Sequence, residues 1–418
     1  MAKVLISFLG TGGVITNDQN VSPVHDKEPR QYRTTNYYLG DKFLGEYSFV
    51  SLALRKEFKA DKAIMIGTTR SMWEEVYSSL KIKHDPSYQA INDDIYFDIA
   101  DYCENSSYQS DLFLPHQDKI EEELGKESHV VLIKYGLDES EIQENINRIL
   151  SLEQFINNGD ELIIDITHSF RSLPILITQL MLYLKTISKK KITISHLFYG
   201  MLDITKEMNN RTPIVDLASV ININDWIIGA YSLQNYGNGT KISELIKKEN
   251  KNVSTLISDF SNAMNLNHIL AIQSQVQRLA GIKNVKYSSK VYEMILSSTI
   301  TEFVNSFKDI KKESVFELYL AEWQAKHHNY AAAYISIIES IVSYVCEIND
   351  LDSKSEECRN KAKEIIHKNS AYINIKKGFI SLNENRKKVA HSLEATDSIV
   401  AMINELNDGI TYFKQIIK

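Results

Sequence analysis

Three residue types are scarce in this sequence of 418 residues, and each shortage narrows the class of protein. The three cysteines, Cys103, Cys346 and Cys358, lie far apart and lack the spacing of metal ligands. They indicate a reducing compartment rather than a disulfide framework. The last of the six prolines is Pro213, and glycine is sparse beyond it. The second half of the chain therefore has few residues that would interrupt a helix.

Positive charge and long apolar runs are lacking as well. Lysine and arginine number 47 against 54 acidic residues, which gives a formal net charge of −7. No global basic field therefore attracts nucleic acid or an anionic membrane, and any nucleotide or RNA site must be a local patch. No apolar stretch reaches the length of a transmembrane helix, and the N-terminal run MAKVLISFLGTGG leads into a glycine turn without a signal-peptide cleavage site. We expect a cytoplasmic protein without a membrane partner.

Short apolar segments alternate with helical patterns in the first half of the chain, which is typical of a doubly wound, mostly parallel sheet. We expect strands at residues 3–9, 62–66, 130–134, 162–166 and 192–199, a polar irregular segment at 16–36 and a helix at 47–58. The irregular segment ends in a predicted ligand-facing loop, which contains Tyr32, Arg33, Thr34 and Asn36. From about residue 222, long amphipathic helical patterns follow one another, among them single helices at 242–257, 263–279 and 330–348. The sequence predicts an α/β domain in residues 1–222 and an all-α region in residues 223–418.

One stretch, residues 161–174, concentrates polar side chains between a predicted strand and a predicted helix. Residues 161–166 are apolar and β-branched, as in a buried strand, and Ser172 with Pro174 marks a helix start. The tight turn between them holds Asp165, Thr167, His168, Ser169, Phe170 and Arg171. In a parallel sheet such a turn lies at the carboxyl edge, where a helix N-terminus favours phosphate groups. The turn could equally serve only as a polar cap for its own helix.

Two further predicted loops reach the same edge of the sheet. The first holds Gly10, Thr11, Gly12 and Gly13, whose backbone N–H groups can approach a phosphate or a purine closely. The second supplies hydroxyl groups and a cation from Thr68, Thr69, Arg70 and Ser71. Either loop alone is also explained as a turn or a helix cap, but the three together suggest a pocket for a phosphate-bearing ligand. Because the glycines do not form G-x-G-x-x-G, an NAD-dependent oxidoreductase is poorly supported.

The C-terminal region offers a separate catalytic candidate in Arg386 and His391. In metal-independent RNA cleavage, a histidine exchanges protons with the ribose hydroxyl or the leaving oxygen, and an arginine stabilises charge on the phosphate. Five residues turn a helix by about 140°, so the two side chains do not share one face, and a two-fold dimer would ease this geometry. The alternative is a solvated basic face. The pair His327 and His328 cannot chelate one metal ion from adjacent helix positions, so no metal site is expected.

At residues 165–171, DITHSFR, the chain resembles the CRISPR-associated proteins named for a D-x-T-H-G motif, with Ser169 in place of the glycine. Tyr199-Gly200-Met201 and residues 212–217 resemble the end of that family's ligand domain. The chain also resembles a HEPN ribonuclease domain at residues 320–347. Arg386 and His391 resemble the R-x4-6-H signature of that domain.

The resemblance implies a function for both regions. The first would be a CARF domain, a Rossmann-like fold that dimerises and binds a cyclic oligoadenylate, expected to be cyclic tetra-adenylate, made by a type III CRISPR complex. The three loops of both chains would contact the ring. The second would form a HEPN dimer, or part of a higher oligomer, that cuts single-stranded RNA without a cofactor while the messenger is bound. Two alternatives stay open: a regulator without catalysis, and an enzyme that degrades the bound ring.

Overall fold

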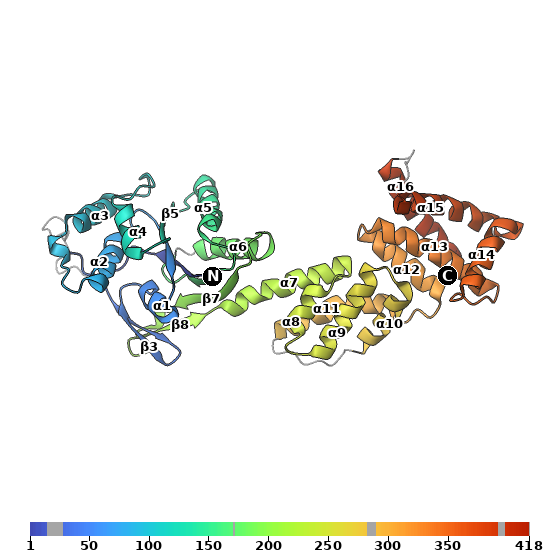
Figure 1. The fold of residues 1–418 in the computed structure, drawn as a ribbon, viewed down its shortest axis with the longest axis horizontal. Helices are drawn as coiled ribbons and strands as arrows, with labels where there is room; N and C mark the ends of the chain where they lie inside the picture. Colours follow the sequence, from blue (N-terminus) through green and yellow to red (C-terminus); the bar gives the residue numbers. More distant parts are fainter. Residues whose placement is uncertain (15–27, 170–171, 282–289, 392–397, 418) are drawn as a thin grey trace. The chain divides into compact units, whose positions relative to one another are not determined.

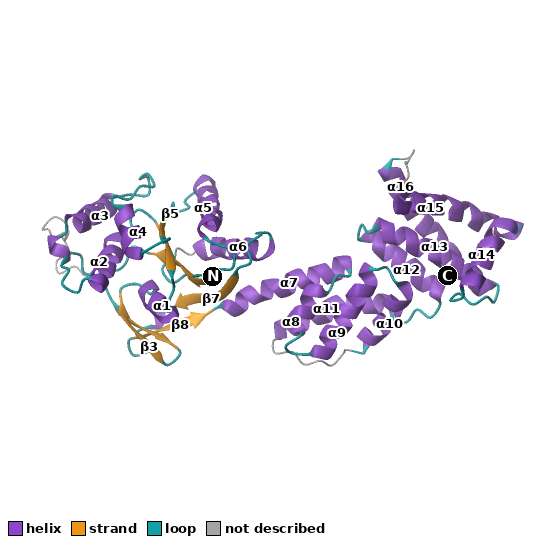
Figure 2. Ribbon diagram, in the orientation of Figure 1, coloured by secondary structure: helices purple, strands orange, loops and turns teal. Residues whose placement is uncertain are grey.

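The computed structural model describes residues 1–14, 28–169, 172–281, 290–391 and 398–417. The chain divides into two compact units, Met1–Asn222 and Ile223–Lys418. The first unit combines a sheet with helices, and the second is helical (Figures 1 and 2). This confirms the predicted fold class, an α/β region followed by an all-helical region. Phe170 and Arg171, both predicted ligand residues, lie outside the described residues.

The sheet of the first unit has eight strands among the described residues, in the order β3-β2-β8-β7-β6-β1-β4-β5. The five strands from β7 to β5 run parallel, β8 is antiparallel to β7, and β3 is antiparallel to β2. The sheet is therefore mostly parallel, as predicted. The strands are β1 (Lys3–Leu9), β2 (Thr35–Leu39), β3 (Lys42–Tyr47), β4 (Lys62–Gly67), β5 (His129–Leu132), β6 (Glu161–Asp165), β7 (Thr193–Gly200) and β8 (Arg211–Asp216).

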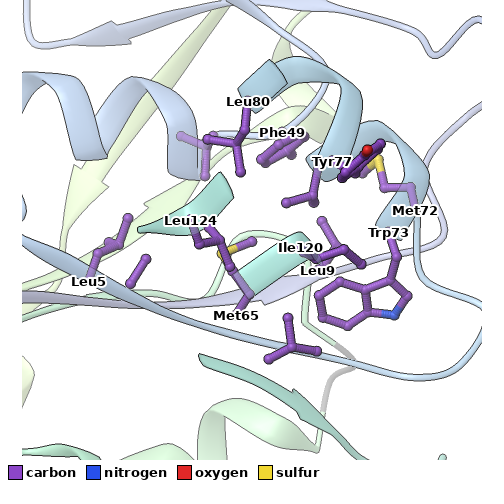
Figure 3. Close-up of a cluster of buried hydrophobic side chains, with 14 of the residues drawn as sticks. Leu5, Leu9, Phe49, Met65, Met72, Trp73, Tyr77, Leu80, Ile120 and Leu124 are labelled. Atoms are coloured by element: carbon purple, nitrogen blue, oxygen red, sulfur yellow. The ribbon is translucent and has the colours of Figure 1, made fainter. Parts of the chain in front are cut away.

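Helices cover both faces of this sheet, because alternate side chains of the central strands point to opposite sides. On one face, Leu5 and Leu9 of β1 join a core with α1 (Ser51–Phe58), α2 (Trp73–His84), α3 (Asp94–Asn105) and α4 (Gln117–Leu124). Figure 3 shows Trp73, Tyr77 and Leu80 of α2 packed in this core. On the other face, Val4, Ile6 and Phe8 join a core with α5 (Glu139–Ser151) and α6 (Leu173–Thr186). Each fully buried large apolar side chain contributes about 1.5–3 kcal/mol to stability.

The hairpin of β2 and β3 corrects the predictions for residues 16–36 and 47–58. Asn36 lies in β2 rather than in an irregular segment, and Tyr47 ends β3 while α1 begins only at Ser51. The two strands join through a two-residue turn that begins with Gly40, whose φ of 59° suits a tight hairpin. Four short 3₁₀ helices complete the described elements: η1 (Ala90–Asn92), η2 (Leu152–Phe155), η3 (Leu202–Ile204) and η4 (Ser370–Tyr372).

The second unit is built from helices around two apolar cores that share one helix. In α12, Phe316 and Leu320 join the first core, while Leu318 and Ala321 join the second. The helices are α7 (Ala218–Tyr236), which begins in the first unit, α8 (Thr240–Ile246), α9 (Lys251–Asn265), α10 (Ile269–Ala280), α11 (Lys290–Phe307), α12 (Glu313–Lys326), α13 (Tyr330–Ile348), α14 (Glu356–Lys368), α15 (Ile373–His391) and α16 (Ile399–Ile416).

Two predicted helices of this unit, at 242–257 and 263–279, are broken. The first is divided between α8 and α9 because the Asn250 side chain accepts a hydrogen bond from Val253 N and caps α9. The second is divided between α9 and α10 near Asn267, whose φ of 50° is left-handed. Helical periodicity continued across both breaks because Asn250, Asn267 and His268 are polar, like the exposed face of a helix.

By length and composition alone, helix α13 could cross a membrane. This corrects the expectation that no apolar stretch reaches the length of a transmembrane helix. In the structure, 67% of an apolar 18-residue stretch of this helix is buried. Ile337, Ile341 and Val345 lie at the centre of the second core. Helix α13 is therefore buried like the core helix of a helical bundle. Such a helix is apolar around most of its circumference because other helices surround it.

Candidate functional site

The structure brings the three predicted loops together at one edge of the sheet. They follow β6, β1 and β4, which are adjacent and parallel. Ser7 of β1 pairs with Asp165 of β6, and Leu9 pairs with Gly67 of β4, so the three strands end side by side. We call the loops the motif loop (residues 165–171), the glycine turn (10–13) and the β4 loop (68–71). This is the ligand-binding edge of doubly wound folds.

The carboxylate of Asp165 holds the motif loop in place from inside the protein. It is fully buried, and its Oδ2 accepts a hydrogen bond from Ser7 Oγ at 2.5 Å. Its Oδ1 accepts from the backbone N and the Oγ1 of Thr167, at 2.9 and 2.6 Å. Burial raises the pKa of Asp165 to about 6, against which the Ser7 and Thr167 hydrogen bonds act. Both oxygens are engaged, so Asp165 positions the loop and does not face a ligand.

Thr167 in turn fixes the motif loop to the end of β7. Gly200 N–H donates to Thr167 Oγ1 at 2.8 Å. A Cβ atom at Gly200 would lie 2.9 Å from Thr167 Cγ2, so only glycine allows this approach without a shift. The Tyr199-Gly200-Met201 segment, which carried part of the family resemblance, therefore packs directly on the motif loop.

His168 is half-buried between the motif loop and the rest of the edge. Its Nε2 lies 3.4 Å from the hydroxyl of Tyr37 on β2. Burial lowers the pKa of His168 to about 4, so the imidazole is neutral near pH 7 and supplies a hydrogen bond but no charge. The neighbouring Ser169 Oγ donates to Ile166 O at 2.7 Å, which tightens the loop.

The glycine turn exposes backbone at this edge. Thr11, Gly12 and Gly13 are exposed, and Gly10 O accepts from Met72 N at 3.0 Å. Gly12 has a φ of 68°, and a Cβ atom there would lie 2.6 Å from the Tyr32 ring. Both its backbone conformation and its neighbour therefore require glycine.

The hydroxyl groups of the β4 loop tie this loop to β1. Ser71 Oγ donates to Leu9 O at 2.7 Å and accepts from Thr68 N at 3.0 Å. Thr68, Thr69 and Ser71 are at most 3% exposed, whereas Arg70 is exposed. Of the four predicted ligand residues in this loop, Arg70 alone presents its side chain at the surface.

A buried network that the sequence did not reveal supports the glycine turn from below. Tyr32 OH and Arg30 Nη1 both bind Glu74 Oε1, the arginine at 2.8 Å, and Arg30 Nη2 binds Glu104 Oε2 at 2.9 Å. Glu74 is fully buried in the first turn of α2. Tyr32 was expected to face a ligand, but it lies buried under Gly12. Nothing in the local sequence distinguishes Arg30 or Glu74 from surface charges.

Arg386 and His391 both lie in the last turns of α15. Arg386 is half-buried, and its Nε donates to Asn383 Oδ1 at 3.1 Å, while His391 is exposed. The preceding Asn385 is buried and donates to Glu405 Oε2 of α16 at 2.5 Å, which anchors this part of α15. No hydrogen bond joins Arg386 to His391 within the described ranges, in line with their angular separation on the helix.

The histidine pair after α12 has structural partners. His327 Nδ1 lies 2.7 Å from Trp323 O, and His328 Nδ1 lies 2.7 Å from Tyr330 OH. In the part of the chain that the structure describes, no three His, Cys, Asp or Glu side chains are grouped to hold a metal ion.

Comparison with known proteins identifies the class. Residues 4–203 match the family described as CRISPR system endoribonuclease Csx1, CARF domain. Residues 222–314 match CRISPR-associated protein MJ1674, second domain. The chain belongs to the CRISPR-associated proteins that carry a CARF domain.

A particular relative covers the whole chain. The CRISPR-associated protein MJ1674 of Methanocaldococcus jannaschii is 30% identical over 438 residues, spanning 100% of this chain. The chain spans 66% of that relative's length. Among solved structures, Enterococcus italicus Csm6 bound to cyclic hexa-2'-fluoro-hexa-dAMP aligns over 100% of this chain and 93% of that chain, with 13% identity and a TM-score of 0.40. At that score the similarity adds nothing to the assignment.

Proposed function

We propose that the protein is an endoribonuclease that is activated by a cyclic oligoadenylate and cleaves single-stranded RNA without a metal ion. It would act in the cytoplasm as an effector of type III CRISPR antiviral defence. The observation that carries the proposal is the coincidence of two features in one chain. The CARF match over residues 4–203 contains the three-loop edge, and a separate helical unit carries Arg386 and His391.

The proposed ligand site is the carboxyl edge of the sheet in a homodimer. The exposed backbone of the glycine turn and the cation of Arg70 suit the phosphates of the ring. The neutral imidazole of His168 suits a hydrogen bond to a base or a ribose. A ring with rotational symmetry fits a two-fold axis at which the same loops of both chains meet. Cyclic tetra-adenylate is the ring that we propose as the activator.

The proposed catalytic site is formed by the HEPN-like end of α15 in two chains. His391 would take the proton of the RNA 2'-hydroxyl or give a proton to the leaving 5'-oxygen. The 2'-oxygen then bonds to the adjacent phosphorus as the bond to the 5'-oxygen breaks. The products are a 2',3'-cyclic phosphate and a 5'-hydroxyl. Arg386 would stabilise the additional negative charge on the phosphate.

Ring binding would activate cleavage by favouring one of two dimer conformations. A ligand shifts such an equilibrium only by its difference in affinity for the two states. The messenger must therefore bind more tightly to the dimer in which the two α15 ends cooperate.

The direct test measures cleavage of a fluorescent single-stranded RNA by the purified full-length protein in EDTA. Cyclic tri-, tetra- and hexa-adenylate are added one at a time, and the ring is followed by chromatography. We expect one ring to activate cleavage and the products to carry 2',3'-cyclic phosphate ends. Binding of a ring without RNA cleavage would instead support a regulator, and loss of the ring would support the ring-degrading alternative.

A further inference from the structure

The carboxyl edge holds a second exposed cation, Arg33, which belongs to the loop at residues 32–36 that the sequence predicts to face a ligand. We infer that Arg33 and Arg70 form an anion clamp beside the glycine turn and contact the phosphates of the ligand. The identity of that ligand as a cyclic oligoadenylate rests on the proposed function. The clamp itself rests on the positions of the two side chains and on the absence of partners for their guanidinium groups among the described residues.

Arg33 lies directly against the glycine turn. Its backbone N–H donates to Gly13 O at 2.8 Å, and the preceding Tyr32 forms a β-bridge with Val14. A Cβ atom at Gly13 would meet Arg33 Cδ at 3.3 Å and Cγ at 3.6 Å. The stem of the arginine therefore crosses Gly13, and the guanidinium begins one bond beyond that contact. The side chain is exposed.

Arg70 belongs to a second segment that is hydrogen-bonded to the end of β1 and to the turn. The following residue, Ser71, donates its hydroxyl to Leu9 O at 2.7 Å. The next residue, Met72, donates its backbone N–H to Gly10 O at 3.0 Å. Arg33 and Arg70 thus come from two different segments, each hydrogen-bonded directly to the end of β1 or to the glycine turn.

A comparison of the arginines in the first unit shows that these two are unusual. Six of the unit's arginines lie within the described residues, and four of them have partners: Arg30 with Glu74 and Glu104, Arg55 with Leu124 O, Arg148 with Glu144, and Arg211 with Asp41 and the Tyr38 ring. Arg33 and Arg70 have no ion pair or hydrogen bond from their guanidinium groups to any described residue. The two guanidinium groups that have no partner among the described residues of the first unit therefore belong to segments that are hydrogen-bonded to the end of β1 or to the glycine turn.

The chemistry of this place favours a phosphate. A guanidinium binds phosphate oxygens through two parallel N–H groups, and neighbouring exposed backbone amides add further donors. Two carboxylates beneath the edge, Asp165 and Glu74, are fully buried, and protein groups bind both oxygens of Asp165 and Oε1 of Glu74. They are not exposed to compete with an incoming anion.

The test compares arginine variants of the full-length protein in calorimetric binding of cyclic tri-, tetra- and hexa-adenylate. One of these rings is expected to bind the wild type. We expect R33A and R70A each to lower the affinity for that ring by about 10-fold or more, as for a lost hydrogen bond to a charged group. Both variants should also flatten the dependence of affinity on salt. R33K should recover only part of the affinity, because lysine keeps the charge but lacks the two parallel N–H donors of a guanidinium group.

The matched control is R148A, which removes an exposed arginine paired with Glu144 elsewhere in the same unit. We expect it to bind the ring like the wild type, and we expect R33A to keep the wild-type melting temperature. If R33A binds the ring as tightly as R148A does, the clamp is refuted while the proposed function stands.

A second probe, inorganic tripolyphosphate, separates the clamp from the proposed function. If the wild type binds none of the rings, the proposed function fails. In that case, tripolyphosphate binding that R33A and R70A weaken still supports the clamp. If the wild type binds neither a ring nor tripolyphosphate, the clamp is refuted as well.

Discussion

The two candidate sites of this chain are built in opposite ways. At the carboxyl edge of the sheet, buried polar groups lock each loop: Asp165 holds Thr167, Thr167 accepts from Gly200, and Ser71 holds Leu9. At the end of α15, Arg386 and His391 lie on one helix, and His391 is exposed. The hydrogen bonds that hold the loops of the first site all lie within one chain. The second presents its proposed catalytic histidine at a surface, as expected of a site that a second copy completes.

The largest effect is expected at the second site. Substitution of His391 by alanine should lower ring-activated RNA cleavage by about 10²–10⁴-fold, because the step loses its proton-transfer group. Ring binding measured by calorimetry should not change, since the locked edge is in the other unit. The control is H328A, an exposed histidine of the same unit that is bound to Tyr330, and it should cleave like the wild type. Undiminished cleavage in H391A would rule out the proposed site.

The next effect concerns the hydrogen bonds of Asp165 that hold the motif loop. Asp165→Ala leaves the buried Ser7 hydroxyl and two partly buried donors of Thr167 without their acceptor, so we expect the free energy of unfolding of the first unit to fall by about 3 kcal/mol. D165N keeps an oxygen for Thr167 and should lose less stability. Urea denaturation followed by circular dichroism measures both. Equal stability of D165A and the wild type would show that the buried hydrogen bonds do not hold the motif loop.

A smaller effect is expected from a methyl group on the glycine turn. Gly12→Ala adds strain at a φ of 68° and a clash with the Tyr32 ring, so ring affinity should fall together with stability. Gly159→Ala is the control, because Gly159 also has a positive φ but has no atom within 4 Å of the added Cβ position. Both should lose about 1–2 kcal/mol of stability from strain. Only G12A should also weaken ring binding, and equal ring affinity in the two variants would argue against a ligand at the turn.

The difference between the two sites also explains what the sequence could predict. Strand β1 and helix α13 have the predicted bounds, because a buried strand and a core helix show their burial in local periodicity. The hairpin was missed because β3 has no buried residue and no alternating pattern. The loops at the edge could be located because parallel strands end at one side of the sheet.

The partners of individual charges could not be predicted in this way. Arg30 and Arg33 are three positions apart and are the same residue type, yet one is buried against Glu74 and the other is exposed beside Gly13. The difference arises from contacts with residues that are distant in the sequence. The same holds for Asp165, which resembles a ligand residue in the motif but is bound to Ser7, 158 positions away.

The smallest expected effect is a pair of opposed pH dependences at the carboxyl edge. Burial raises the pKa of Asp165 from 3.8 to about 6, so the folded protein keeps a proton that the unfolded chain loses, and stability falls as the pH rises through this window. Burial lowers the pKa of His168 from 6.5 to about 4, so only the unfolded chain takes up a proton there, and stability rises as the pH rises from about 4 to 6.5. The two contributions oppose each other between about pH 4 and 6.

Removing one group should therefore reveal the other. In H168Q, we expect the stability of the first unit to fall as the pH rises from 4 to 6, and in D165N we expect it to rise. Urea denaturation series at pH 4, 5 and 6 measure both slopes relative to the wild type, with H84Q as the control for loss of an exposed histidine. Parallel slopes in H168Q and D165N would mean that the two groups do not titrate as their burial requires. Opposite slopes would show that burial raises the pKa of Asp165 and lowers the pKa of His168, so that the imidazole is neutral near pH 7 and the exposed arginines are the cations of this edge.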